Sequence, residues 1–544
     1  MKRKLIIFLF ILAVIIPASF SNWGLTESSE ARYAEISKEM YATDDYIHPK
    51  LLGIQHYHKP PVTYYITSLG YYLFGINEFG ARFFLHIALL IQLWLVYKIT
   101  QLLYNDKRIS LTATLIYFSY PIVQAAANNL TTDAYLTTFI FFGIYFFLKY
   151  HQTPKHNIFI YLFYIFCGLA FLTKGPVGIL PQILFAVFYT RILRIKSTFN
   201  IHNFLALILG IAICVSWFVV LVFQNKNFLN YFLRHQIVDR VASDAFKRSK
   251  PFWYYFVTMP LLGLPAFYYI INYLAIKFRS LHFRRTLAAV LLITLAILLL
   301  VFSASSSKLI LYVLPLYLFI AILSAKHLSL ISLKTIKIFE NISFSFSYVI
   351  FTGLIVACFI PLQFVFPKIP VLLLSVGGII CMLFFSYKNF QVRYIKAPFI
   401  NALTISVLTF VFPFIMKAND LKINSVKSVA NFIKQQSNNK PGSIAVYDYL
   451  LPSLAFYANE KIITLNNGNP VAQRETQFEA NDSMWESSYF KLNKNKDSTV
   501  LTSLLAKPNS YIIALAKNAL PDSLSILKKN LPNKIVMEKW IIYY

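Results

Sequence analysis

Four glutamates and one arginine lie directly after the first apolar run, in the stretch LTESSEARYAEISKEM at residues 25–40. Among them, Glu27, Glu30 and Arg32 stand where the chain is predicted to leave the membrane. A carboxylate in such a place can accept a proton as a general base, and a guanidinium can bind an anion. These three residues are therefore candidates for a functional role. The side chains expected on the solvated face of the same stretch are Glu35, Lys38 and Glu39.

The spacing of this stretch predicts an interfacial helix. Ser28 or Ser29 can cap its N-terminus, and Glu30 in the first turn lies where the helix dipole favours an anion. One face is formed at helical spacing by Tyr33, Ile36 and Met40. We expect an amphipathic helix lying along a membrane surface.

The chain is far more apolar than a soluble protein. Of its 544 residues, 57% are hydrophobic and 13% are charged, and its mean hydropathy is +0.58. Soluble domains average about 25% charged residues. The composition therefore indicates a membrane protein. The net charge of +29 is spread over loops facing lipid headgroups rather than gathered in a soluble basic domain, so no nucleic-acid partner is expected.

Apolar runs long enough to span a bilayer recur as far as about Met416. Thirteen spans are predicted, the first of them a retained anchor rather than a cleaved signal peptide. They lie near residues 4–20, 81–103, 110–126, 132–148, 157–172, 176–193, 204–223, 254–274, 286–302, 309–323, 344–361, 369–386 and 397–415.

The lysines and arginines set the orientation of these spans. With the N-terminus in the cytoplasm, every loop on that face is basic, whereas most short loops on the other face carry one or two basic residues. Three segments then lie outside the cell membrane: residues 21–80, residues 224–252 and the tail from Lys417 to Tyr544. The many basic residues of the 224–252 loop indicate an anionic ligand. We expect a multi-pass membrane protein with these three segments on its external side.

Two domains are predicted. Residues 1–416 form a transmembrane domain with the external loops 21–80 and 224–252, and residues 417–544 form an extracytoplasmic domain. The tail alternates the helical run SVKSVANFIKQQ with the strand-like runs SIAVYDY, KIITL and SYIIALA, which predicts a small α/β fold. The tail shows no catalytic constellation.

Five groups of short motifs occur in order between residues 20 and about 325. They are EARYAEISKEM with GIQHYHKPPVTYYITSLGYYLFG and FGARF, then NNLTTDAYLTTFIFFG, GLAFLTKGPVGILP, PFWYYFVTMPLLGLPA and SSSKLILYVLPLY. In this order the chain resembles the lipid-linked-sugar glycosyltransferases of the GT-C fold, in particular the bacterial undecaprenyl-phosphate aminoarabinose transferases, which are relatives of the protein O-mannosyltransferases. Together with the predicted spans, the resemblance implies an all-α polytopic membrane protein of GT-C type. It would have about thirteen transmembrane helices, external interfacial helices and a small C-terminal α/β domain. Residues 1–416 would then be the catalytic domain, with the site on the external loops 21–80 and 224–252.

The chemistry implied by this resemblance breaks the bond between an anomeric carbon and a phosphate oxygen. Cations must stabilise the departing phosphate, and a carboxylate must orient the acceptor hydroxyl and take its proton. The implied donor-phosphate residues are Arg32, Tyr33, Lys59, Lys174, Arg240, Lys308 and Tyr312. The implied catalytic carboxylates are Glu30, Asp133 and Glu27. An acid at the start of a span, as Asp133 is, can alternatively serve only to cap the helix.

The sequence departs from the family pattern at two places. Ser29 stands where the family carries the aspartate that acts as catalytic acid, and Glu27 can supply the missing carboxylate. His58 stands where the family carries a glutamate that helps to hold zinc, and His235 is a partner from the 224–252 loop. A divalent metal such as zinc is thus one hypothesis for the two histidines, and interfacial hydrogen bonding is the other. His48 and His56 are interpreted as surface residues.

These features predict a glycosyltransferase that uses a polyprenyl-phosphate-linked sugar, with undecaprenyl phosphate as leaving group. The acceptor would be lipid A, lipopolysaccharide or another lipid or glycan outside the membrane. The resemblance thus implies a multi-pass inner-membrane protein whose active site and tail face the periplasm. Protein O-mannosylation is the alternative within this class, and the sequence does not decide between them. A transporter or flippase is the alternative of another class, but the gathering of charges in external loops disfavours it.

Overall fold

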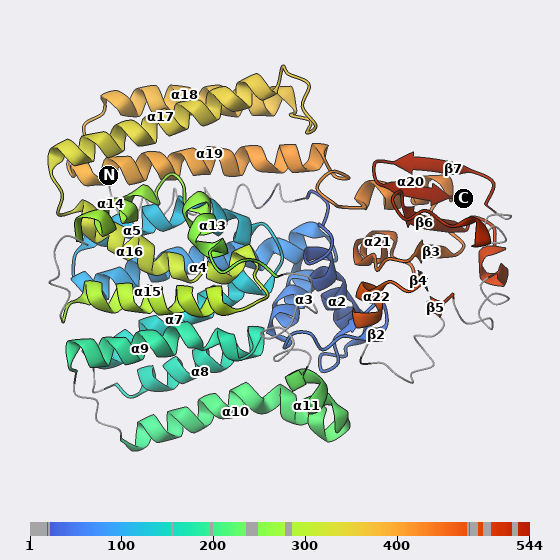
Figure 1. The fold of residues 1–544 in the computed structure, drawn as a ribbon, viewed down its shortest axis with the longest axis horizontal. Helices are drawn as coiled ribbons and strands as arrows, with labels where there is room; N and C mark the ends of the chain where they lie inside the picture. The colour runs from blue at the N-terminus through green and yellow to red at the C-terminus, as the bar shows by residue number, and fades with distance from the viewer. Residues whose placement is uncertain are drawn as a thin grey trace. The chain divides into compact units, whose positions relative to one another are not determined.

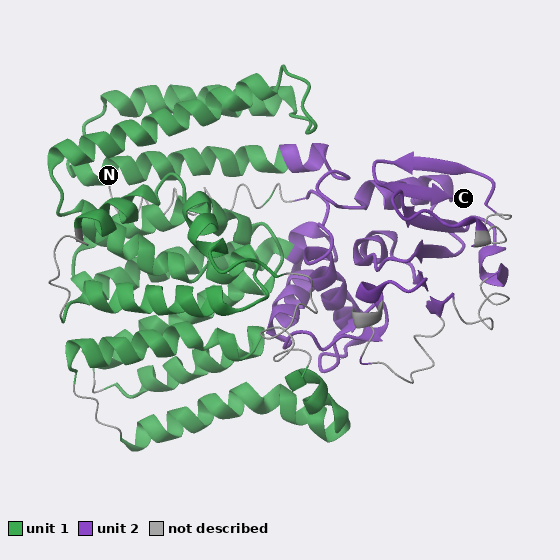
Figure 2. Cartoon of the chain, in the orientation of Figure 1, with its two compact units in different colours: residues 1–20, 82–414 green, residues 21–81, 415–544 purple. Residues whose placement is uncertain are grey.

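The computed structural model describes residue 19 and residues 22–153, 156–195, 200–234, 249–277, 285–475, 478, 488–492, 502–524 and 531–544. The first predicted span and two predicted site residues, His235 and Arg240, lie outside these ranges except for Ser19. The chain divides into two compact units, residues 1–20 with 82–414 and residues 21–81 with 415–544 (Figure 2). The predicted division into residues 1–416 and 417–544 differs from this one, because residues 21–81 belong to the same unit as the C-terminal residues.

The first unit is built of helices (Figure 1). In chain order they are α4 (Glu78–Tyr104), α5 (Lys107–Phe118), α6 (Pro121–Ala127), α7 (Thr132–Gln152), α8 (Ile158–Lys174), α9 (Leu180–Leu193), α10 (Ile201–Gln224), α11 (Asn227–Tyr231), α13 (Tyr254–Leu262), α14 (Tyr268–Lys277), α15 (Leu287–Ala304), α16 (Leu316–Leu328), α17 (Leu333–Ala357), α18 (Lys368–Tyr387) and α19 (Lys396–Ala418).

Every predicted span from residue 81 onward overlaps at least one of these helices, but the number thirteen is not confirmed. By length and composition, 7 of the described helices can cross a membrane, or 8 if the bent pair α5 and α6 forms one span. The axes of that pair differ by 68°. The single span predicted at residues 254–274 is instead two helices, α13 and α14. Pro265 lies between them and lacks the N–H that a continuous helix would require.

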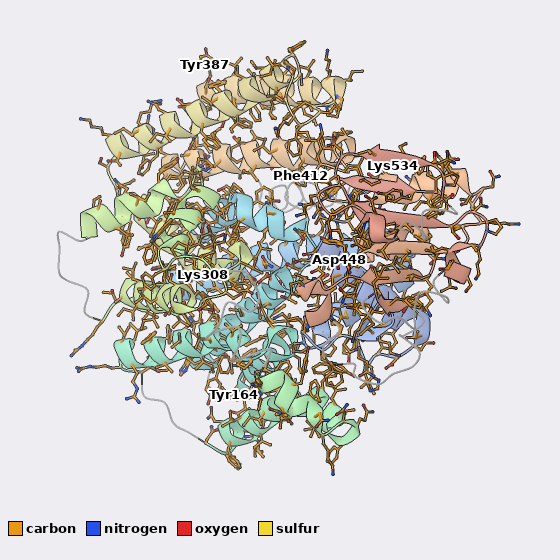
Figure 3. All side chains as sticks on the ribbon, turned by 45° about the vertical axis from the view of Figure 1, so that its right-hand side comes forward. Tyr164, Lys308, Tyr387, Phe412, Asp448 and Lys534 are labelled. Atoms are coloured by element: carbon orange, nitrogen blue, oxygen red, sulfur yellow. The ribbon has the colours of Figure 1, made fainter. Side chains whose placement is uncertain are left out.

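Small residues bring the helices of the first unit close together. α8 packs against both α7 and α10. A Cβ added at Gly210 of α10 would lie 2.9 Å from Cβ of Tyr164, a residue of α8 labelled in Figure 3. Such close approach is typical of helix interfaces in membranes, where packing rather than the hydrophobic effect holds helices together.

The outer helices of the first unit present apolar side chains on their surface. α17 and α18 run side by side in Figure 1 and pack against each other. Val349 of α17 and Leu373 of α18 are each 70% exposed. Apolar surfaces of this kind are suited to contact with lipid tails. They agree with the prediction, made from composition, that this is a membrane protein.

The second unit combines two helices from the early chain with a sheet from the late chain. Its N-terminal part holds α2 (Glu30–Thr43), a hairpin of β1 (Lys50–Leu51) and β2 (Ile54–Gln55), and α3 (Val62–Phe74). α2 packs against α3, and the hydroxyl of Tyr71 donates a 3.0 Å hydrogen bond to the carbonyl of Ala34. The sequence pattern for an interfacial helix thus gives a helix close to the predicted bounds.

The C-terminal part is the predicted small α/β fold. Its elements are α20 (Lys427–Gln436), β3 (Ile444–Tyr447), α21 (Pro452–Ala458), β4 (Ile462–Asn466), α22 (Pro470–Glu475), β5 (Tyr489–Lys491), β6 (Tyr511–Leu515), β7 (Lys534–Met537) and β8 (Trp540–Tyr543). The strand order is β5-β4-β3-β6-β8-β7. The first four strands are parallel, and β8 pairs antiparallel with both β6 and β7.

Both faces of this sheet are covered, so its strands are apolar on both sides. Ile444 and Val446 of β3 belong to one core, which they share with α20 and α21, whereas Ala445 and Tyr447 belong to the core on the opposite face. This alternation follows from the period of two in a strand. Parallel strands buried on both faces read as continuous apolar runs, which is why SIAVYDY and KIITL are recognisable in the sequence.

Candidate functional site

The Glu30 carboxylate closes the start of α2. Its Oε2 accepts hydrogen bonds from the backbone N–H of Thr26 at 2.9 Å and from the Thr26 hydroxyl at 3.0 Å. Ser29 is the N-cap residue, as predicted, but its side chain makes no capping hydrogen bond. Glu30 lies in the first turn, where the helix dipole favours its charge, and it holds the loop that precedes the helix.

Glu27 is a buried carboxylate in that loop. The residue is only 9% exposed. Its Oε1 accepts a 2.7 Å hydrogen bond from the backbone N–H of Ser453, at the start of α21. The other oxygen, Oε2, is buried with no hydrogen-bond partner among the described residues. Burial raises the pKa of Glu27 to about 7, and the charges of Arg32 and Lys539 act in the opposite direction.

Arg32 and Tyr33 follow on the first turns of α2. Arg32 is half-buried, and its charge acts on both Glu27 and Tyr449. The ring of Tyr33 lies 5.7 Å from that of Tyr64, centroid to centroid. The predicted apolar face is present, because Tyr33 packs against a core that contains Ile36 and Met40.

The predicted solvated face of α2 is wrong. Glu35 is buried, and Lys38 lies 3.5 Å from its carboxylate while donating a 2.8 Å hydrogen bond to the carbonyl of Ala455. The Glu39 carboxylate accepts hydrogen bonds from the backbone N–H groups of Leu52 and Gly53, at 2.6 and 3.0 Å. Burial raises the pKa of Glu35 to about 8 and also raises that of Glu39. α21 and the β1–β2 hairpin cover this face, which the helical pattern alone does not reveal.

The rings of His56 and His58 lie against each other at a tilt of 41°, ahead of α3. Their ring centroids are 4.0 Å apart and both residues are buried, so the interpretation of His56 as a surface residue is wrong. His48 is partly buried and pairs with Asp45 at 2.9 Å. Lys59 is half-buried directly before Pro60 and α3.

The described residues do not by themselves make a zinc site. No group of three or more histidine, cysteine, aspartate or glutamate side chains that could hold a metal ion occurs within the described ranges. His58 is one candidate ligand, and its predicted partner His235 lies outside those ranges. A catalytic zinc usually has three protein ligands, so the described part of the chain supplies an incomplete set.

In the first unit, Asp133 and Lys174 form a buried ion pair. Asp133 lies in the first turn of α7 and Lys174 ends α8, and their side chains are 8% and 6% exposed. The lysine Nζ contacts Oδ1 of Asp133 and also lies 4.0 Å from the centroid of the Tyr312 ring. The helix cap comes from Thr131, whose side chain accepts from the N–H of Asp133 at 3.5 Å. The three predicted residues Asp133, Lys174 and Tyr312 are thus brought together.

Lys308 makes contacts of a different kind. Its buried ammonium donates hydrogen bonds to the carbonyls of Lys250 and Ser305, at 2.8 and 2.5 Å (labelled in Figure 3). The Tyr255 hydroxyl donates to the neighbouring carbonyl of Leu309 at 2.9 Å. Tyr312 lies in the short helix η3 (Ile310–Val313). The bonds of Lys308 and Tyr255 together hold the segment directly before η3 against residues 250–255. Two of the three N–H bonds of the Lys308 ammonium are used in this way.

Four residues of the C-terminal part that the sequence does not mark as functional surround Glu27. They are Asn424, Tyr449, Ser453 and Lys539. Their distance from Glu27 along the chain leaves no local pattern that pairs them. The sequence shows no catalytic constellation in the tail, and the structure places these four tail residues around Glu27.

Residues 58–219 match the family described as dolichyl-phosphate-mannose-protein mannosyltransferase. The undecaprenyl phosphate-alpha-4-amino-4-deoxy-L-arabinose arabinosyl transferase 1 of Proteus mirabilis (strain HI4320) is 31% identical over 331 residues, which are 60% of this chain and 59% of the relative. The corresponding transferase of Pseudomonas savastanoi pv. phaseolicola is 30% identical over 328 residues, 58% of this chain and 59% of the relative. The match therefore spans less than two thirds of the length of these relatives.

A crystal structure of ArnT from Cupriavidus metallidurans bound to undecaprenyl phosphate matches with a TM-score of 0.76 at 20% identity, covering 100% of this chain and 98% of that chain. The same protein in the apo state matches with a TM-score of 0.74. This likeness establishes the fold. The predicted GT-C architecture with a C-terminal α/β domain is confirmed, and so is the resemblance to the aminoarabinose transferases.

Proposed function

We propose that this protein is an integral membrane glycosyltransferase that moves a sugar from a polyprenyl phosphate, with undecaprenyl phosphate as leaving group, to an acceptor hydroxyl. The observation that carries the proposal is the buried Asp133–Lys174 pair beside Tyr312. All three residues belong to motifs by which the chain resembles the lipid-linked-sugar transferases. The names of the relatives from Proteus mirabilis and Pseudomonas savastanoi support the same class of donor.

In the proposed reaction, the acceptor oxygen bonds to the anomeric carbon while the bond from that carbon to the phosphate oxygen breaks. The electron pair of the broken bond leaves with the polyprenyl phosphate, and the acceptor proton passes to a carboxylate. Cations such as Arg32 and Lys59 would stabilise the phosphate as its charge grows. These are the roles that the sequence predicts for both residues.

Among the carboxylates, Glu27 has the properties of the proton acceptor. Its pKa is about 7, close to the value at which a general base works best near neutral pH. Glu30, by contrast, uses Oε2 to hold Thr26, so we assign it the role of fixing the loop. Asp133 would orient the substrate together with Lys174. Glu27 would thereby replace the aspartate that the family carries at the position of Ser29.

We propose that the acceptor is lipid A, lipopolysaccharide or another glycan at the periplasmic face of the inner membrane. The distribution of basic loops supports this orientation. The alternative acceptor is a protein hydroxyl, as in O-mannosylation, and the family match at residues 58–219 favours keeping it as a second candidate.

The decisive experiment incubates the purified protein with labelled undecaprenyl-phosphate sugars and candidate acceptors and identifies the products by mass spectrometry. Transfer of label to a lipid A acceptor with release of undecaprenyl phosphate is expected. Label on a peptide would instead support O-mannosylation. No release of undecaprenyl phosphate with any donor would overturn the proposal.

The predicted zinc ion stays a proposal with its own test. If His58 and His235 hold zinc against the donor phosphate, treatment with a chelator lowers transfer and added zinc restores it. His58→Ala should bind less zinc than the wild type by elemental analysis, whereas His48→Ala should bind as much. Equal zinc content in all three proteins, or activity indifferent to the chelator, would remove the metal from the proposal.

A further inference from the structure

In the six-stranded sheet of the C-terminal part, loops follow the carboxyl ends of the parallel strands. The parallel strands β3 and β6 lie next to each other, but the chain passes from β3 outward through β4 and β5 before it returns to β6. The order therefore reverses between β3 and β6. In open α/β sheets, ligands bind beyond the carboxyl ends of the strands at such a reversal.

Functional groups of the second unit gather beyond these strand ends. Tyr449 and Ser453 follow β3, and the β7–β8 turn that carries Lys539 pairs with the end of β6 through a 2.7 Å hydrogen bond from the N–H of Ala516 to the carbonyl of Lys539. The ring of Tyr449 lies 5.7 Å from that of Trp540. Asp448, labelled in Figure 3, begins the loop after β3.

The loop at residues 22–29 is bound along its length by C-terminal residues. The N–H of Leu25 donates a 2.7 Å hydrogen bond to the Tyr457 hydroxyl, and Lys427 donates a 3.0 Å bond to the carbonyl of Asn22. Side chains of the C-terminal part lie so close to Gly24 that an added Cβ would be 2.1 Å from Oδ1 of Asp420.

Asn424 makes the most specific of these contacts. Its carbonyl accepts from the N–H of Glu27 at 2.9 Å, and its Nδ2 donates to the Glu27 carbonyl at 2.8 Å. Its Oδ1 in turn contacts the ammonium of Lys539. Asn424 has a φ of 71°, a left-handed conformation that asparagine adopts more readily than most residues. The chain of contacts thus runs from Lys539 through Asn424 to the backbone of Glu27, while Ser453 holds its carboxylate.

We infer that the C-terminal domain is a working part of the active site, in which Asn424 and Lys539 are positioning residues that hold the Glu27 carboxylate ready to accept the acceptor proton. The inference rests on the proposed function. It assigns to the tail a role that neither the motifs nor the family match at residues 58–219 covers.

The titratable groups around Glu27 come from three parts of the second unit. Arg32 and Glu35 lie on α2, Tyr449 follows β3 and Lys539 lies in the β7–β8 turn. Arg32 and Lys539 favour the ionised carboxylate, and burial opposes them. Removing the Lys539 charge should therefore raise the pH at which Glu27 becomes ionised and able to take a proton.

The test compares the pH dependence of kcat/KM for sugar transfer by the full-length protein in three variants. Lys539→Met should shift the acidic limb of the profile to higher pH, so that transfer falls several-fold more near pH 6 than near pH 9. Lys539→Arg should restore the wild-type limb. The matched control is Lys534→Met, a lysine at the other end of β7 (Figure 3), which should leave the limb in place.

A second variant addresses Asn424. Asn424→Gly keeps the left-handed backbone but removes the amide, and should lower kcat at least tenfold with little change in KM for the donor. A Lys539→Met profile that keeps the wild-type limb, with an Asn424→Gly protein of normal kcat, would overturn the inference while wild-type transfer stands. If the wild type itself transfers no sugar, the proposed function fails instead, which is a distinct result.

Discussion

The ammonium of Lys174 contacts the carboxylate of Asp133, and both side chains are more than nine-tenths buried. Their helices, α7 and α8, are neighbours in the chain, so the pair closes one end of a helical hairpin. A charge at such depth is costly unless it is paired. The pair is therefore both a stability element and a constraint on where Asp133 can point.

Replacing one member of this pair should harm the protein more than replacing both. Asp133→Asn or Lys174→Met leaves the other charge buried and uncompensated, which costs about 3–5 kcal/mol of stability in typical cases. The double variant should be more stable than the sum of the single variants predicts. Thermal unfolding of the four proteins in one detergent, arranged as a double-mutant cycle, measures the coupling.

Sugar transfer separates the two roles of the pair. We expect transfer to be lost in all three variants, including the double variant in which stability is partly regained. If the double variant transferred sugar at a normal rate, the pair would be structural only. Additive losses of stability would show that the two charges do not interact.

Lys59 offers a test of donor binding in the second unit. Lys59→Ala should reduce sugar transfer by at least a hundredfold, because a cation at a growing phosphate charge supplies several kcal/mol of transition-state stabilisation, on the order of that lost with a single oxyanion donor. Binding of undecaprenyl phosphate, followed by quenching of intrinsic fluorescence, should weaken as well.

The control for Lys59 is Lys50→Ala. Lys50 is a partly exposed lysine whose ammonium lies 3.6 Å from the Asp45 carboxylate, so its loss should leave transfer within twofold of wild type. Near-normal turnover in Lys59→Ala would take that residue out of the mechanism.

The sequence predicts the elements of the fold well where periodicity is strong. The apolar runs give the helices from α4 to α19, and the runs around Ile444, Ile462 and Tyr511 give the parallel strands of the tail. Asp133 and Lys174 are each singled out by the sequence as members of motifs, but it is the structure that shows them paired.

The sequence fails where burial depends on distant segments. Glu35 and Glu39 have the spacing of a solvated helix face, yet α21 and the β1–β2 hairpin cover them. The contact between Glu27 and Ser453 joins residues 426 positions apart. No local pattern encodes such a contact. The family motifs lie between residues 20 and about 325, so they contain no residue of the tail.

Buried Glu35 should make the stability of the protein depend on pH. Its pKa is raised from 4.5 to about 8 in the folded protein, so the folded state keeps this proton over a pH range in which the unfolded state has lost it. The free energy of unfolding therefore falls as pH rises from about 4.5 to about 8 and levels off above that range. Glu35→Gln cannot ionise and should flatten this part of the curve.

Denaturant unfolding at a series of pH values checks this prediction. The neutral variant should gain stability relative to wild type as pH rises, even though it loses the interaction with Lys38. Glu460→Gln changes an exposed glutamate and should leave the curve unchanged. A Glu35→Gln protein whose stability follows the wild-type curve would show that folding does not raise the pKa of Glu35.

A matched pair of glycines tests the packing of the first unit. Gly210 of α10 faces α8, where an added Cβ would lie 2.9 Å from Cβ of Tyr164 and 3.0 Å from its carbonyl oxygen, whereas a Cβ at Gly353 of α17 would meet no atom within 4 Å. Gly210→Ala should therefore destabilise the protein by about 1–3 kcal/mol through overpacking. Gly353→Ala should be neutral or stabilise by up to about 1 kcal/mol, because alanine is the better helix former. Thermal unfolding of both variants in the same detergent measures the difference, and equal melting temperatures would show that α8 and α10 do not pack this closely.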